Sequence, residues 1–297
     1  MRILIIGGTG LLGSAMTSLW TGHEILATGS KDLDIRSRDQ IHDVMSRFRP
    51  DRVVLAAAFT DVDGCEKNPA RATEVNGVGA ENVAFVARQL GCWLALISTD
   101  YVFDGAKQAP YETEDPMNPI SVYGRSKMEG EAAVRRILPD ACIARTSWVF
   151  GNGWRCFPES ILSIAAKQKE IEVVSDQIGC PTFNEDAAMA IGELVRGGVS
   201  GTVHVTNAGQ CSRHELAKEI LQAAGFGTIP VLPVLTDEHA RPARRPKYSV
   251  LSAVSLNRLG IFVRPWREAV RDYVQKRANK ASMVLGRGAS TNFAEAK

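Results

Sequence analysis

The chain has 297 residues, of which 45% are hydrophobic and 23% are charged, and its formal net charge is +2. This length suits one large domain or two smaller ones with a substantial core. The near-neutral charge, without any basic run, argues against nucleic acid as a partner. No stretch approaches the roughly 20 apolar residues that span a bilayer, and the apolar run at the amino terminus is too short for a signal peptide. We therefore expect a soluble, cytoplasmic protein with no membrane partner.

The six cysteines are widely scattered and never form a Cys-x-x-Cys pair. A chain of this size has no need of disulfides, so we expect free thiols in a reducing compartment. The cysteines are Cys65, Cys92, Cys142, Cys156, Cys180 and Cys211.

Short apolar runs alternate with longer amphipathic segments along the first half of the chain. The runs predict strands at 2–6, 24–28, 52–57, 93–98 and 141–146. A helix is predicted at 10–20, and a longer one begins at Pro69, with Asn68 as its cap, and ends at Gly91. This alternation predicts an α/β fold with a Rossmann-type doubly wound parallel sheet, whose ligands lie beyond the carboxyl ends of the strands.

The pattern changes after Trp148 to separate helices among loops rich in proline and arginine. Helices are predicted at 184–198 and 212–225, and Ser212 with Glu215 forms a capping box at the start of the second. A last amphipathic helix follows Pro265.

These patterns divide the chain into two domains and a tail. Residues 1–147 are predicted to form mainly a dinucleotide-binding domain, and residues 148–278 mainly a smaller α/β substrate domain, with segments of the two free to interleave. Residues 279–297 are small and polar without periodicity, which predicts a disordered tail.

The stretch "GGTGLLG" places glycines 7, 10 and 13 directly after a strand and at the start of a helix. Glycines there let the backbone approach a pyrophosphate, which the unpaired N–H groups of the helix favour. An ordinary turn is the alternative, but the preceding strand favours a cofactor site. The expected cofactor contacts in this turn are Gly7, Thr9, Gly10, Leu11 and Leu12.

NAD-binding sites usually carry a carboxylate about 20 residues after the glycines, at the end of the second strand. Here Ser30 and Lys31 occupy that place. A hydroxyl and a cation suit a 2′-phosphate better than bare ribose hydroxyls, so we expect NADPH, with NADH as the alternative. A solvated loop with Asp32 close by would be the non-functional interpretation.

In "SVYGRSKMEGE", Tyr123 and Lys127 lie four residues apart on one helical face, a spacing that alone could be a solvated contact. However, Thr99 follows the fourth strand, and a hydroxyl there followed by Tyr-x-x-x-Lys resembles the short-chain dehydrogenase/reductase superfamily. The resemblance implies that Tyr123 is the general acid/base and that Thr99 binds the reacting carbonyl. It also implies that Lys127 binds the nicotinamide ribose and lowers the pKa of the tyrosine.

Several further strings resemble the dTDP-4-dehydrorhamnose reductases, the sugar-nucleotide branch of the extended superfamily. They are "DLDI", "AAAFTDVD", "STDYVFDG", "YGRSKMEGE", "RTSWVFG", "DQIGCPT" and "RRPKYSVL", and the similarity runs from the first strand to the last helix. The resemblance implies NADPH-dependent reduction of the 4-keto group of a nucleotide-linked 6-deoxy-hexulose, namely dTDP-4-dehydro-L-rhamnose to dTDP-L-rhamnose.

The resemblance also implies contacts for the cofactor and for the nucleotide sugar. Asp34 and Ile35 would border the adenine, and Ala57, Ala58 and Thr60 would line the nicotinamide ribose. Thr99, Asp100 and Trp148 would face the sugar, and Arg245 would bind the diphosphate, since a guanidinium fork matches phosphate geometry. The alternatives are core packing for Trp148 and a surface charge for Arg245.

Some family members carry a glutamate two residues after the third glycine, where it helps bind magnesium at a dimer contact. This chain has Ala15 there, so we expect no metal and question that mode of dimerisation, leaving monomer and homodimer open.

Two rival functions stay open. The first is a related nucleotide-sugar dehydratase, epimerase or 4-ketoreductase. The dehydratases place an Asp-Glu pair after the threonine, whereas here Thr99 is followed by Asp100 and Tyr101. The second rival is a non-catalytic regulatory subunit like that of methionine adenosyltransferase. Neither the nucleotide nor the sugar stereochemistry follows from the sequence.

Overall fold

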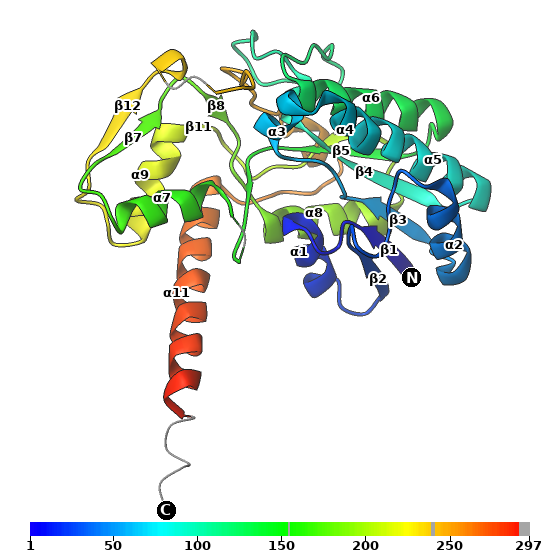
Figure 1. Ribbon diagram of the computed structural model, residues 1–297, viewed down its shortest axis with the longest axis horizontal. Coiled ribbons are helices and arrows are strands. Elements are labelled where there is room, and N and C mark those ends of the chain that lie inside the picture. The colour runs from blue at the N-terminus through cyan, green and yellow to red at the C-terminus, as the bar shows by residue number, and fades with distance from the viewer. Residues whose placement is uncertain (154, 239–240, 291–297) are drawn as a thin grey trace, which may run out of the picture.

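The computed structural model describes residues 1–153, 155–238 and 241–290 of the chain. Its centre is a six-stranded sheet in which all the neighbouring strands are parallel, in the order β10-β5-β4-β3-β1-β2 (Figure 1). The strands are β1 (Arg2–Ile6), β2 (Glu24–Thr28), β3 (Arg52–Leu55), β4 (Trp93–Thr99), β5 (Cys142–Thr146) and β10 (Gly201–His204).

The Rossmann-type sheet predicted from the sequence is confirmed, and the first five strands lie where the apolar runs place them. The strand order reverses at β1, which has β2 on one side and β3 on the other. In sheets of this kind ligands bind beyond the carboxyl ends of the strands at the reversal.

Helices cover both faces of the sheet (Figure 1). One face carries α1 (Leu11–Leu19) and α8 (Asn184–Gly197), which share a core cluster with β1 and β5. The other face carries α2 (Arg38–Phe48), α5 (Gly79–Leu90) and α6 (Val122–Ile137). Both α8 and β10 come from the second half of the chain, so the halves interleave.

The segment predicted as one helix from Pro69 to Gly91 is divided in the structure. It follows α3 (Val62–Lys67) and contains α4 (Pro69–Ala72), the π-helix η1 (Thr73–Val78) and α5. Asn68 caps the start as predicted, since its side chain accepts from the Arg71 N–H, and Gly91 ends α5 at φ 69°. The π turn directs Asn76 inward, where its amide bonds both backbone groups of Phe59 and the Ser126 hydroxyl.

A separate apolar core lies among elements from the second half of the chain, namely α7 (Phe157–Ala165), α9 (Arg213–Ala223) and α11 (Trp266–Ser290). We call this part of the molecule the second domain. The predicted capping box of Ser212 and Glu215 at the start of α9 is confirmed. Three short strand pairs complete this domain: β6 (Val149–Phe150) with β9 (Thr182–Phe183), β7 (Ile171–Val174) with β12 (Val231–Val234), and β8 (Ile178–Gly179) with β11 (Cys211–Ser212). The short elements η2 (Asp100–Val102), η3 (Thr236–Glu238) and α10 (Val254–Asn257) lie in the connections.

The sequence predicts a disordered tail from residue 279, whereas the structure has helix in residues 279–290. Helix α11 continues to Ser290 and extends away from the rest of the molecule (Figure 1). Residues 291–297 lie outside the described residues.

All six cysteines are free thiols, as predicted. Among the described residues, no helix is both long enough and apolar enough to cross a membrane.

Two buried charged side chains join α6 to the sheet. Arg145 on β5 and Glu131 on α6 are 1% and 0% exposed and form a forked ion pair, with Nε–Oε1 at 2.9 Å and Nη2–Oε2 at 2.8 Å. Arg145 also donates to the Thr113 carbonyl. Removing one partner of such a pair leaves the other charge buried without compensation.

We therefore predict that Glu131→Gln lowers the free energy of unfolding by roughly 3 to 5 kcal/mol, because Arg145 stays buried and uncompensated. Urea denaturation of the purified variant measures this loss. The control is Glu24→Gln, which removes a pair with Arg2 whose side chains are 39% and 61% exposed. It should cost less than about 1 kcal/mol. Equal losses in the two variants would show that the pair of Glu131 and Arg145 does not anchor α6 to the sheet.

Candidate active site

The glycine turn between β1 and α1 packs tightly against the chain that follows β3. A Cβ on Gly7, whose φ is +90°, would lie 2.4 Å from the Ala57 nitrogen. A Cβ on Gly13 would lie 2.1 Å from the Gly7 carbonyl oxygen. Side chains at these positions are therefore excluded, and the backbone itself forms the surface of the turn.

The start of α1 is open to an anion. Its N-cap residue is Gly10, so no side chain caps the first N–H groups, and the first turn contains no acidic residue. Free N–H groups and the helix dipole favour a phosphate there. The turn therefore fits the pyrophosphate of a dinucleotide.

The other residues expected to contact the cofactor differ in how far their side chains are exposed. Leu12 is 8% exposed and packs in the core of the α1 face, so only its backbone could contact a ligand. Thr9 points toward the end of β2, where a Cβ on Gly29 would lie 2.6 Å from its hydroxyl oxygen. Ala57 and Ala58 are partly exposed after β3, and Thr60 is exposed.

The end of β2 is a tight turn closed by a carboxylate. Asp32 Oδ2 accepts a hydrogen bond of 2.8 Å from the Gly29 N–H, and the Asp32 N–H donates to the Gly29 carbonyl. Ser30 and Lys31 are exposed at the tip. The strand end lies where the sequence places it, with the cation free to approach a ligand.

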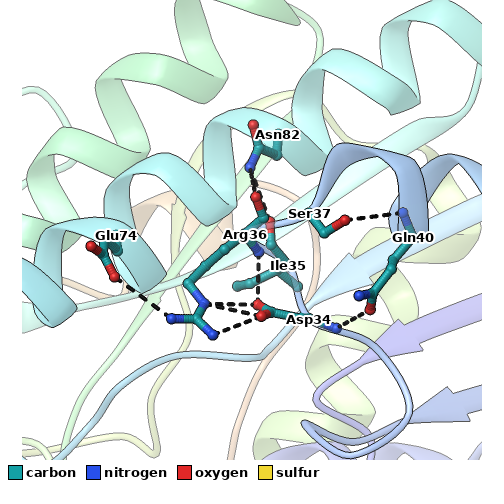
Figure 2. A network of polar contacts seen from close by, with 7 residues as sticks. All are labelled: Asp34, Ile35, Arg36, Ser37, Gln40, Glu74 and Asn82. Carbon is teal, nitrogen blue, oxygen red and sulfur yellow. Dashed lines mark hydrogen bonds and ion pairs between the residues drawn. The ribbon is translucent and has the colours of Figure 1, made fainter.

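The next loop, residues 34–36, is held by the polar network of Figure 2. The Arg36 guanidinium donates to both carboxylate oxygens of Asp34 and lies 3.6 Å from the Glu74 carboxylate. Hydrogen bonds from Arg36 hold the pKa of Asp34 below its usual range. Asn82 donates to the Ile35 and Arg36 carbonyls, and the Ile35 side chain is buried against Gly79. This network fixes the backbone of the loop.

Tyr123 lies in the first turn of α6, beside the carboxyl end of β4. Ser121 caps the helix by accepting from the Gly124 N–H. Gly124 allows close approach, because a Cβ there would lie 2.0 Å from the Tyr101 carbonyl oxygen. The rings of Tyr123 and Tyr101 meet edge to face, with centroids 5.8 Å apart. The sequence prediction that brings Tyr123 to the end of the fourth strand is therefore consistent with the structure.

Burial is the main influence on the pKa values of both Tyr123 and Lys127. Burial raises the pKa of Tyr123, and a hydrogen bond with Thr99 opposes that rise. Lys127 Nζ donates a hydrogen bond of 2.7 Å to the Ile97 carbonyl. Burial lowers the pKa of Lys127 to about 8, and the charge of Glu131 opposes that shift.

Thr99 and Asp100 form a buried chain with Ser249 from the second domain. The Thr99 hydroxyl donates to Asp100 Oδ1 at 3.0 Å, and the Ser249 hydroxyl donates to Asp100 Oδ2 at 2.6 Å. Thr99 also accepts from the Tyr101 N–H. Burial raises the pKa of Asp100 to about 6. The carboxylate, only 2% exposed, thus fixes the direction in which the Thr99 hydroxyl points.

Trp148 has a strained backbone, with φ +44°. Such a conformation is uncommon for a bulky residue and concentrates at functional sites. A Cβ on Gly179 would lie 2.5 Å from the indole, and the Arg213 guanidinium carbon lies 3.5 Å from the ring centroid on Trp148. The indole is partly exposed, so core packing alone does not describe it.

Arg245 is not the surface charge of the alternative interpretation. Its side chain is 12% exposed and its two terminal nitrogens bond the two carboxylate oxygens of Asp63 at 2.6 and 2.9 Å. This ion pair joins the second domain to α3.

Three residues of the site escaped sequence reasoning: Asn76, Arg213 and Ser249. Asn76 lies inside a helical pattern that gives no sign of a π turn. Ser249 belongs to the string "RRPKYSVL", whose arginine drew attention instead. Arg213 directly follows the capping residue of α9, an exposed-looking position in the sequence.

Among the residues that the structure describes, no group of three or more His, Cys, Asp or Glu side chains could hold a metal ion. Ala15 is 5% exposed and packs in the core between α1 and α8. The residue at this position therefore faces the interior.

Comparison with known proteins places the chain in a family. Residues 1–279 match the RmlD substrate binding domain family. The spore coat polysaccharide biosynthesis protein SpsK of Bacillus subtilis is 40% identical, and the match covers 94% of this chain and 98% of SpsK. The dTDP-4-dehydrorhamnose reductase of Mycolicibacterium smegmatis is 39% identical over 92% of this chain and 85% of the relative.

A solved structure agrees with this match. The dTDP-4-dehydrorhamnose reductase of Bacillus anthracis, in complex with NADP, superimposes with a TM-score of 0.90 at 35% identity. The superposition covers 93% of this chain and 99% of that one. Sequence and fold agree over nearly the whole length, and the chain belongs to the RmlD substrate binding domain family.

Proposed function

We propose that this protein reduces the 4-keto group of a nucleotide-linked 6-deoxy-hexulose with NADPH, converting dTDP-4-dehydro-L-rhamnose to dTDP-L-rhamnose. The observation that carries the proposal is the contact between Tyr123 and Thr99 at the carboxyl end of β4, on the same edge of the sheet as the glycine turn. The names of the M. smegmatis and B. anthracis relatives support this substrate, and the bound NADP of the latter supports the cofactor.

The residues present fit a dinucleotide. The uncapped start of α1 suits the pyrophosphate, Thr9 and the exposed Ser30 and Lys31 suit the adenosine ribose phosphate, and the loop of Asp34 and Ile35 suits the adenine. Ala57, Ala58, Thr60 and Lys127 then line the nicotinamide ribose. When bound, NADPH supplies the hydride, which goes to the carbonyl carbon at position four.

Tyr123 donates the proton to the oxygen of that carbonyl as the alkoxide forms. Thr99 lies beside Tyr123; its hydroxyl proton, which Asp100 accepts in the structure, turns to the same oxygen when the carbonyl is bound. Lys127 is positively charged below about pH 8, and its field stabilises developing negative charge nearby. Lys127 would hold the nicotinamide ribose when the cofactor is bound.

The rivals lack support from particular residues. An Asp-Glu dehydratase needs a second carboxylate where this chain has Tyr101. A regulatory subunit would not need the buried chain that orients Thr99. Monomeric and dimeric forms both agree with the proposed reaction.

The first test is turnover. The purified protein should oxidise NADPH with dTDP-4-dehydro-L-rhamnose faster than with other nucleotide-linked 4-keto sugars. Tyr123→Phe should lower kcat by roughly a hundredfold or more, because the proton donor is lost, while the Kd for NADPH changes little. Absorbance at the nicotinamide band gives kcat and fluorescence titration gives Kd. Near wild-type kcat in this variant would remove Tyr123 from catalysis.

The pKa of Asp100 yields a second test. Because it is raised to about 6 from 3.8, its contribution to stability is fully present below about pH 4 and is lost as the pH rises through about 6. Asp100→Asn cannot ionise; its amide oxygen still accepts from one of the two hydroxyls, and its amide nitrogen donates to the other. From pH 4 to 7, the free energy of unfolding of the wild type should therefore fall by roughly 2 kcal/mol relative to the variant. A difference independent of pH would show that Asp100 is not buried as described.

Cofactor preference rests on Lys31. A charge pair between its ammonium and the 2′-phosphate should favour NADPH over NADH by roughly tenfold to a hundredfold in kcat/KM. Lys31→Glu should abolish or reverse the preference, mainly through the KM for NADPH. Arg36→Gln is the matched control, because Arg36 already pairs with Asp34 and Glu74. If Arg36→Gln removes the preference and Lys31→Glu does not, Arg36 holds the phosphate.

A further inference from the structure

A carboxylate from a distant segment caps the helix that carries Tyr123. Glu66, near the end of α3, accepts a hydrogen bond of 2.8 Å on Oε1 from the Val122 N–H. Val122 is the first residue of α6, so its N–H has no acceptor inside the helix. The N-cap residue Ser121 accepts from the Gly124 N–H and not from Val122. A negative charge at the amino end of a helix is also favoured by the helix dipole.

The first turn of α6 is held by two segments, and Tyr123 lies between the two contacts. Glu66 holds Val122 from the segment that follows β3. Gly124 packs on the segment that follows β4, where a Cβ would lie 2.0 Å from the Tyr101 carbonyl oxygen. The residue between Val122 and Gly124 is Tyr123. A shift of either contact would therefore move the catalytic side chain.

Helix α3 has only six residues, yet it is fixed at several points. Cys65 is 0% exposed, and its thiol donates to the Phe59 carbonyl at 3.6 Å. Phe59 belongs to the segment 57–60, which lines the nicotinamide ribose in the proposed function. Asp63 pairs with Arg245 of the second domain. Because α3 is tied to the cofactor segment and to the second domain, it can act as a support for α6.

We propose that Glu66 is a positioning residue for Tyr123. Its carboxylate sets the first turn of α6 relative to the cofactor segment, so that the Tyr123 hydroxyl meets the carbonyl oxygen of the sugar. Glu66 acts through the backbone of Val122 and not on the substrate. The inference rests on the proposed function, because it takes Tyr123 to be the proton donor. Nothing in the sequence singles out Glu66.

Fluorine NMR reads the surroundings of Tyr123 without turnover. The chain has five tyrosines, so labelling with 3-fluorotyrosine gives five resonances, and Tyr123→Phe identifies that of Tyr123. Glu66→Ala removes the acceptor and should shift or broaden this resonance, while that of Tyr273, in the core of the second domain, stays in place. Glu66→Gln keeps an acceptor oxygen and should restore the wild-type resonance. An unchanged Tyr123 resonance in Glu66→Ala would overturn the proposal.

The donor of the same hydrogen bond gives an independent variant. Proline has no N–H and suits the first position of a helix. Ser121 already has the extended backbone that a following proline requires, with φ −128° and ψ 158°. Val122→Pro should therefore reproduce the effect of Glu66→Ala on the Tyr123 resonance. The matched control is Val122→Ala, which keeps the N–H and should resemble the wild type.

The two variants should not add when they are combined, because each removes the same hydrogen bond. The double variant of Glu66→Ala and Val122→Pro should therefore show the resonance of either single variant. Additive shifts would show that Glu66 acts on Tyr123 by another route, and would overturn the proposal.

Turnover should follow the resonance. Glu66→Ala should lower kcat by roughly tenfold or more, because a small displacement of the proton donor slows the transfer. The Kd for NADP⁺ should stay within about twofold, and Glu66→Gln should recover most of kcat. Equal losses of kcat in the two variants would contradict a positioning role. If the protein reduces no 4-keto sugar, but its Tyr123 resonance depends on Glu66, the proposed reaction is rejected and the positioning contact is retained.

Discussion

The active site depends on how α6 is fixed to the sheet by two buried charges. Lys127 and Glu131 lie one helical turn apart, and Tyr123 lies one turn before them on the same face. Lys127 bonds the backbone of β4, and Glu131 pairs with Arg145 on β5. Because buried charges tolerate only positions where they are compensated, the helix has one register on the sheet. That register places Tyr123 at the end of β4.

The second domain completes the site rather than merely covering it. Ser249 donates to Asp100, which accepts the Thr99 hydroxyl proton, and Arg245 pairs with Asp63. The contacts of Ser249 and Arg245 join the segments after β4 and β3 to the second half of the chain. The position of the second domain therefore affects the orientation of the reacting hydroxyls.

Sequence reasoning succeeded where the determinants are local. The glycine turn, the first five strands and the capping box of α9 follow from short patterns, and the Tyr-x-x-x-Lys pair with Thr99 follows from a family resemblance. Sequence reasoning failed where the structure depends on contacts between residues that are far apart in the sequence. The edge strand β10 is short and polar in pattern, the π turn is made by contacts of Asn76 with Phe59 and Ser126, and Arg213 stacks on Trp148, far away in the sequence. The pKa of Tyr123 likewise depends on burial that no spacing reveals.

The most direct measurement follows the hydride. NADPH deuterated at the transferable position of its nicotinamide, incubated with the protein and dTDP-4-dehydro-L-rhamnose, should yield dTDP-L-rhamnose with one deuterium at position four of the sugar, as read by NMR. Consumption of NADPH that leaves the sugar unlabelled, or that places deuterium at another carbon, would contradict the account.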